Sequence, residues 1–170
     1  MPAVSTHFAI RHEFTATPEA FWRVFLHEPY NVELYERIGV KERKVLDRSE
    51  DAETVKWAVR IMPRRDLPSV VKKVVGGDLG YTEISTYYKG KDVIDVRVEP
   101  TLMKDRTRIQ GRYTVKTIGE RRLLRTFEGD IAVDLPLVGR RIEAVVLDDM
   151  KRSYDVAAQV TAEWLARRGV

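Results

Sequence analysis

The sequence predicts an α+β fold: one strand, two short helices, six further antiparallel strands and one long C-terminal helix. Three observations carry this prediction. Residues 4–14 alternate between an apolar and a polar face, as a half-buried strand does. Residues 40–134 hold short alternating runs separated by turn residues such as Gly90 and Gly119. Residues 137–166 carry an apolar stripe at helical spacing and contain no proline.

The first strand and the two short helices each have a local signature. Within residues 4–14, Phe8 and His12 fall on the apolar face, so His12 is expected to point inward as a hydrogen-bonded core residue. Thr17 followed by Pro18 is a typical helix start, because threonine caps the N-terminus and proline tolerates the first turn. A second helix starts at residues 28–29 and ends at Gly39.

Six strands are predicted after the two helices, followed by the long helix. Their expected ranges are 40–47, 53–62, 81–88, 93–98, 107–117 and 122–134. Residues 66–80 interrupt them and read as a short amphipathic helix, with a proline near its start and paired glycines after it. Pro136 cannot continue a strand ladder, so it marks the change from the last strand to the helix over residues 137–166.

Length and composition favour a single domain over residues 1–170. The chain has 170 residues, of which 44% are hydrophobic and 33% charged, and two domains would leave each half with a marginal core. The net charge of +4 comes from 30 basic and 26 acidic residues scattered along the sequence. No basic run exceeds two residues, so nucleic acid is not an expected partner.

The residue inventory also excludes several kinds of chemistry. The sequence has no cysteine, which excludes disulfides, thiol catalysis and cysteine-based metal sites. Its three histidines do not occur at ligand spacing, so neither a metal site nor a cofactor is expected. No stretch approaches the roughly 18 apolar residues of a membrane span, and we expect a cytoplasmic protein.

Four segments resemble a known superfamily. They are FTATPEAFWRVF, EPYNVELYERIG, DLPSVVKKVVGGDLGYTEIS and VDLPLVGRRIEAVV. Together with the order of elements, they resemble an uncharacterised bacterial branch of the START-like (SRPBCC, helix-grip) superfamily. The third segment is also similar to the corresponding part of PRELI-like lipid-transfer proteins. The resemblance implies a curved sheet of six to seven strands wrapped around the C-terminal helix, with a ligand cavity between them.

The implied cavity gives a set of expected ligand-binding residues. We expect a pocket of several hundred Å³, in the range of ligand sites generally. The side chains expected at the site come from two strands and the long helix: Trp57, Tyr113, Ile142, Val146, Asp149, Met150 and Ser153. The competing interpretation is that the apolar members of this set simply pack a full core.

Asp149 is the most informative of these residues, because it falls among the apolar positions of the long helix. A buried carboxylate is costly unless it is paired or hydrogen-bonded. We consider three roles for Asp149: an ion pair with a basic residue of the sheet (Lys56, Arg60, Arg97 or Arg112), the polar end of a ligand site shared with Ser153, or an exposed position on a helix rotated from the expected phase.

The predicted function is the non-enzymatic binding or transfer of a hydrophobic small molecule or lipid. An enzyme of the cyclase or hydrolase type in the same cavity is the alternative, and it requires polar groups converging on one spot. No catalytic residue is assigned. Residues 66–80 are either a lid, an element that touches a membrane transiently through its basic residues, or simple packing. A protein-interaction module with a small or empty cavity is a third possibility.

Overall fold

The computed structural model of the protein describes residues 4–64, 69, 72–73, 76 and 79–167. The elements follow one another in the order β1 (Thr6–Phe14), α1 (Pro18–Phe25), α2 (Glu28–Ile38), β2 (Val40–Glu50), β3 (Thr54–Pro63), β4 (Tyr81–Tyr88), β5 (Val93–Pro100), β6 (Thr107–Gly119), β7 (Arg122–Val133) and α4 (Gly139–Arg167). Most of the predicted helix within residues 66–80 lies outside the described residues.

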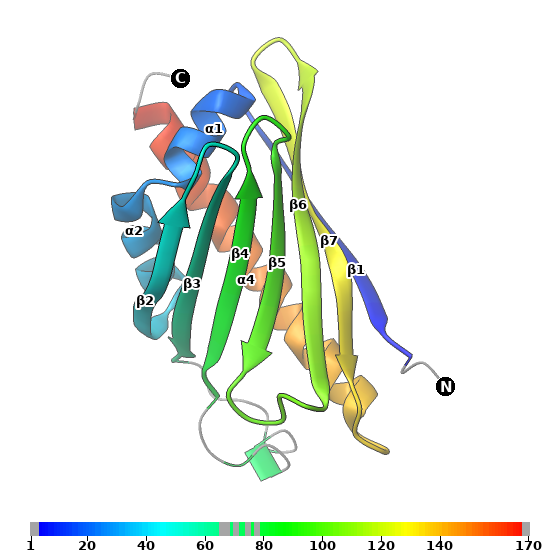
Figure 1. Cartoon of the computed structure of the whole chain (residues 1–170). Helices are drawn as coiled ribbons and strands as arrows, with labels where there is room; N and C mark the ends of the chain where they lie inside the picture. Colours follow the sequence, from blue (N-terminus) through cyan, green and yellow to red (C-terminus); the bar gives the residue numbers. More distant parts are fainter. Residues whose placement is uncertain (1–3, 65–68, 70–71, 74–75, 77–78, 168–170) are drawn as a thin grey trace.

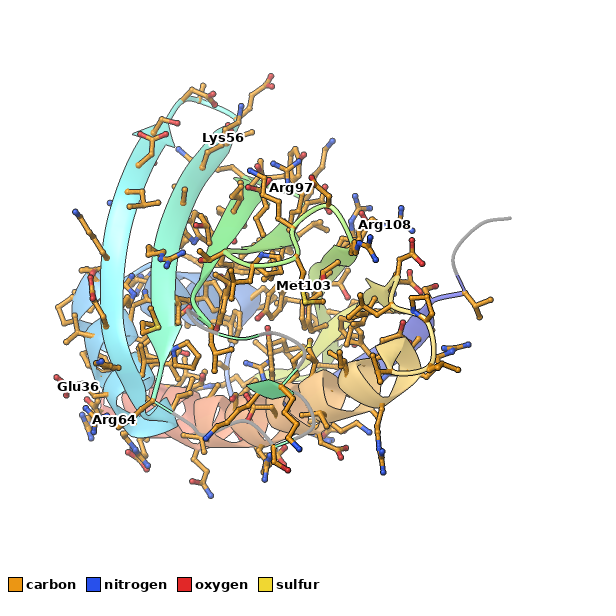
Figure 2. All side chains as sticks on the ribbon, turned by 90° about the horizontal axis from the view of Figure 1, so that it is seen from below. Glu36, Lys56, Arg64, Arg97, Met103 and Arg108 are labelled. Carbon is orange, nitrogen blue, oxygen red and sulfur yellow. The ribbon has the colours of Figure 1, made fainter. Side chains whose placement is uncertain are left out.

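The seven strands form one antiparallel sheet in the order β1-β7-β6-β5-β4-β3-β2. The sheet curves around α4, which crosses one of its faces diagonally (Figure 1). Outward-facing strand residues such as Lys56 and Arg97 are exposed on the side away from α4 (Figure 2). The predicted fold class is therefore confirmed: a curved antiparallel sheet wraps a long C-terminal helix, and two short helices follow the first strand.

The two short helices begin and end where local chemistry predicts. The Thr17 hydroxyl accepts a hydrogen bond from the Ala20 N–H at 3.3 Å, which satisfies one of the free donors of the first turn of α1. Gly39 ends α2 in the left-handed conformation with φ of 88°. Helix α4 begins at Gly139, two residues later than predicted, because Leu137 has φ of 70° and cannot be helical.

A buried carboxylate fixes the connection between β7 and α4. The Val133 N–H, at the end of β7, donates to Glu143 Oε1 at 2.9 Å, and the Thr6 hydroxyl of β1 donates to Oε2 at 2.5 Å. Gly139 allows this tight path, since a Cβ there would stand 2.2 Å from the Val133 carbonyl oxygen. Strand β7 and helix α4 are therefore held together at one end of the sheet.

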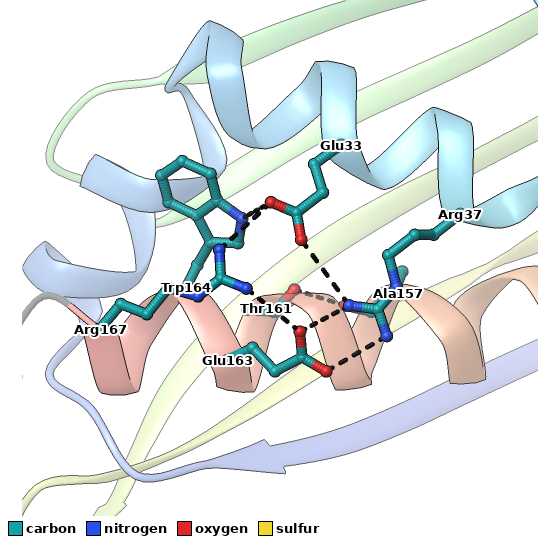
Figure 3. A network of polar contacts seen from close by, with 7 residues as sticks. All are labelled: Glu33, Arg37, Ala157, Thr161, Glu163, Trp164 and Arg167. Atoms are coloured by element: carbon teal, nitrogen blue, oxygen red, sulfur yellow. Dashed lines mark hydrogen bonds and ion pairs between the residues drawn. The ribbon is translucent and has the colours of Figure 1, made fainter.

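The other end of α4 is tied to α2 by an ionic network (Figure 3). Arg37 of α2 donates to both carboxylate oxygens of Glu163 at 2.5 and 3.2 Å, and this hydrogen bonding raises the pKa of Arg37 and lowers that of Glu163. Glu33 accepts from the indole N–H of Trp164 at 3.0 Å and from Arg167 at 3.3 Å. Most of these groups are exposed, so the network positions α2 more than it stabilises the fold.

Candidate functional site

A cavity of about 160 Å³ lies between α2, the middle of α4 and the concave face of the sheet. Its walls include five tyrosines: Tyr30, Tyr35, Tyr81, Tyr113 and Tyr154. The lining residues Val45 and Arg48 of β2 and Glu28 of α2 are exposed, so the cavity opens between these two elements. The volume is smaller than the several hundred Å³ expected from the sequence, because large aromatic side chains fill much of the space under the sheet.

Three of the seven predicted site residues border this cavity: Trp57, Tyr113 and Ser153. The other four, Ile142, Val146, Asp149 and Met150, are absent from its walls. Ile142, Val146 and Met150 pack against the hydrophobic core instead. They occupy the N-terminal half of α4, where Glu143 is hydrogen-bonded to β1 and β7, whereas the cavity adjoins the middle of the helix.

Of the three roles considered for Asp149, the structure fits the third, a partly exposed position on a helix rotated from the expected phase, and not burial on the inner face. The Asp149 side chain is 44% exposed and forms an ion pair with Arg152 at 3.6 Å, one turn further along α4. At 100° per residue, Asp149 lies on the flank of a face centred near Met150, Tyr154 and Ala157. The fully buried carboxylate of this helix is Glu143, which the apolar pattern did not single out.

Three stacked aromatic rings form one side of the site. Tyr113 of β6 stacks on Phe127 of β7 with centroids 4.3 Å apart, and Phe127 stacks on Tyr154 of α4 at 5.1 Å. The hydroxyls of Tyr113 and Tyr154 are hydrogen-bonded to each other beside the cavity. Burial raises the pKa of both phenols well above the ordinary tyrosine value, so both stay protonated at neutral pH.

Arg125 of β7 brings a buried positive charge to the same cavity. The residue is 2% exposed, and its guanidinium lies over the rings of Phe14 and Tyr154 at 5.3 and 5.5 Å. Its Nη2 donates to Nδ1 of His12 at 2.8 Å, while Nε is buried and has no hydrogen-bond partner among the residues that the structure describes. Sequence reasoning missed Arg125, although its place between Leu123 and Phe127 gives it the inward phase of β7.

The contact with Arg125 fixes the protonation pattern of His12. A guanidinium only donates hydrogen bonds, so Nδ1 of His12 must accept and the ring proton sits on Nε2. Nε2 then donates to Asp155 Oδ1 of α4 at 2.9 Å. His12 is thus an inward-facing, hydrogen-bonded residue as predicted, and the Asp155–His12–Arg125 chain orients the guanidinium.

Glu83 of β4 forms a second, acidic pole. It borders the cavity together with Tyr81 and Arg43. Desolvation by burial raises the pKa of the Glu83 carboxyl, and the positive charge of Arg43 partly opposes this shift. Arg43 is itself held by a two-pronged ion pair with Glu28, at 2.5 and 3.2 Å, and lies over the ring of Tyr35. Sequence reasoning had assigned no role to Glu83.

Comparison with known families places the chain in one of them. The family described as "Protein of unknown function (DUF2505)" matches residues 9–165. The chain belongs to this family. No curated protein matches the sequence.

Several solved structures share the fold at low sequence identity. The Zhui aromatase/cyclase from Streptomyces sp. R1128 has a TM-score of 0.71 and 13% identity, over 98% of this chain and 97% of that one. A START superfamily protein from Mycobacterium smegmatis has a TM-score of 0.57 and 17% identity, over 94% and 98%. Norcoclaurine synthase from Thalictrum flavum, in complex with dopamine and hydroxybenzaldehyde, has a TM-score of 0.65 and 12% identity, over 95% and 88%. The chain therefore has the START-like fold expected from its sequence.

Within the described residues, no helix combines the length and apolar character needed to cross a membrane.

Proposed function

We propose that this protein binds a small, largely apolar molecule in the cavity beside α4. The observation that carries the proposal is an internal cavity with aromatic and aliphatic walls and a few polar groups, which is the usual make-up of a small-molecule site. The norcoclaurine synthase structure, which has this fold, holds the aromatic compounds dopamine and hydroxybenzaldehyde.

The size of the cavity narrows the class of ligand. An apolar cavity of about 150 Å³ is large enough to hold benzene, and the cavity here measures about 160 Å³. Sites for drug-sized molecules are larger, at roughly 300–1,000 Å³. The cavity thus favours a compound with a single ring over a lipid with long acyl chains, which narrows the broader expectation of a hydrophobic molecule or lipid.

A direct binding experiment tests this proposal. Benzamide, a neutral single-ring compound, is titrated into the protein by calorimetry and by amide NMR. We expect saturable binding, with changes in the amide chemical shifts of residues that border the cavity. In the variant Ala157→Leu a larger side chain enters the cavity wall, and binding should weaken at least tenfold. The matched change Ala162→Leu, at an exposed position of the same helix, should leave it unchanged. Equal binding by both variants would contradict the proposed site.

Acid–base catalysis in the same cavity is the second candidate function. It is favoured by Glu83, whose raised pKa suits a general acid, and by the paired hydroxyls of Tyr113 and Tyr154 on the cavity wall. Two solved structures with this fold carry the names of enzymes, an aromatase/cyclase and a synthase. A compound that binds and is converted by the protein, but is left unchanged by Glu83→Gln, would identify this function.

A further inference from the structure

We propose that the ligand carries an anionic group, a carboxylate attached to an aromatic ring, and that Arg125 binds it. This inference deepens the proposed function and rests on it. Its basis is that Arg125 is buried and has no carboxylate partner among the described residues. Arg43, on the same cavity, also has a buried Nε without a partner, but it is ion-paired with Glu28.

Within the described part of the chain, Arg125 is a buried cation without an anionic partner. Burying a guanidinium is costly unless it is paired, and buried charges in proteins are normally paired or coordinated. Among the residues that the structure describes, no carboxylate is within ion-pair distance of Arg125, and its Nε–H is buried without an acceptor. Exposed arginines of the same sheet do have acidic partners: Arg112 binds Asp95 at 2.6 Å and Arg122 binds Glu13 at 2.6 Å.

The guanidinium is also fixed in place. Its neighbour His12 is held by Asp155, and two aromatic rings flank its faces. A planar fork of donors held in this way matches the two oxygens of a carboxylate. Because Arg125 borders the cavity, a ligand inside can reach it and provide the missing negative charge.

The surroundings indicate what the rest of the ligand looks like. The hydroxyls of Tyr113 and Tyr154 use one proton in their mutual hydrogen bond, which leaves the other free to donate to a ligand oxygen. Glu83 borders the same cavity, and in its ionised form it would repel a carboxylate placed beside it. The acidic group is therefore expected at the Arg125 side, with the ring between the tyrosines and the aliphatic wall.

The test compares three probes that differ in one property each. Benzoate and benzamide have nearly the same shape, but of these two only benzoate is charged at pH 7. Hexanoate carries the same charge as benzoate but has no ring. Dissociation constants are measured by calorimetry for the unmodified protein, for Arg125→Met and for Arg122→Met. The last variant removes the same charge from the outer face of the same strand.

We expect the unmodified protein and Arg122→Met to bind benzoate at least tenfold more tightly than benzamide or hexanoate. In Arg125→Met the ratio of benzoate to benzamide affinity should fall to about one. If the unmodified protein binds benzamide and benzoate equally, the inference is wrong and the proposed function stands. If hexanoate and benzoate bind equally well, the inference that the ligand contains an aromatic ring is wrong. If no probe binds, both proposals fail. Even if Arg125→Met does not fold, the ratio of benzoate to benzamide affinity in the unmodified protein shows whether the site prefers an anionic ligand.

Discussion

Glu143 and Arg125 are both charged and almost fully buried, at 1% and 2% exposure, yet they are partnered very differently. Glu143 accepts hydrogen bonds from the Val133 N–H and the Thr6 hydroxyl, and Arg140 lies 3.2 Å from the same carboxylate. Among the described residues, Arg125 has one hydrogen-bond partner, His12, and its buried Nε–H has none. The two residues lie in different regions: Glu143 at the closed junction of β7 and α4, Arg125 beside the cavity.

This difference in hydrogen bonding indicates that the charge of Glu143 is structural, whereas the charge of Arg125 is available to a ligand. Both oxygens of the Glu143 carboxylate already accept hydrogen bonds inside a packed junction, and these bonds join β1, β7 and α4. A buried guanidinium with an unused donor beside a cavity has capacity left for another molecule. The state of hydrogen bonding, rather than burial alone, indicates where to look for function.

The largest effect is expected for Glu143→Ala. The change leaves the buried Val133 N–H without an acceptor, so the free energy of unfolding should fall by about 3 kcal/mol. Urea denaturation measures the loss. Glu143→Gln, which keeps an oxygen for that N–H, should lose less. A loss below about 1 kcal/mol for Glu143→Ala would mean that the junction does not depend on this carboxylate.

Arg125→Met should change the stability of the ligand-free protein far less. Replacing a buried, incompletely paired charge by an apolar side chain of similar length is often neutral, so we expect a change within about 1 kcal/mol in either direction. The same denaturation experiment checks it. A loss as large as that of Glu143→Ala would make Arg125 a structural residue and remove the distinction between the two charges.

Glu83→Gln should make stability less dependent on pH. Because burial raises the folded-state pKa of Glu83 above its ordinary value of 4.5, the folded state holds this proton more tightly than the unfolded state. The resulting stabilisation is fully present below pH 4.5 and is lost as the pH rises through the folded-state pKa. Relative to the unmodified protein, Glu83→Gln should therefore gain stability between pH 4.5 and pH 8.

Urea denaturation at both pH values measures this gain. The exposed turn residue Glu120 supplies the control, and Glu120→Gln should show no such trend. A relative loss of stability for Glu83→Gln on raising the pH would mean that the carboxyl is stabilised in its charged form.

The smallest effect is expected for Asp149→Ala. Its carboxylate is 44% exposed and its ion pair with Arg152 lies at the surface, so the free energy of unfolding should fall by less than about 1 kcal/mol. The melting temperatures of Asp149→Ala and Glu143→Ala are measured side by side, which compares two acidic residues of the same helix. Equal losses would show that exposure does not predict which carboxylate the fold needs.

The sequence by itself determined the order and nature of the described elements. Strand β4 has the predicted bounds of 81–88, and β6 and β7 begin at the predicted residues 107 and 122. The caps at Thr17 and Gly39 lie where the chain indicated. These features depend on residues a few positions apart, since alternation, capping and helical spacing are set by the local geometry of the backbone.

The site was predictable only in part, and for a physical reason. Trp57, Tyr113 and Ser153 border the cavity as expected, but Asp149 was assigned to the inner face because a long stripe with gaps leaves the helix phase loosely defined. Arg125 and Glu83 have the inward phase of their strands, which periodicity can show.

Periodicity cannot show whether a buried charge finds a partner. Arg125 meets His12 across 113 positions of sequence, and Thr6 meets Glu143 across 137. Only the folding of distant strands against α4 decided that both oxygens of Glu143 are hydrogen-bonded, while the Nε–H of Arg125 has no acceptor among the described residues. That outcome depends on three-dimensional packing, which brings together groups that no local pattern relates.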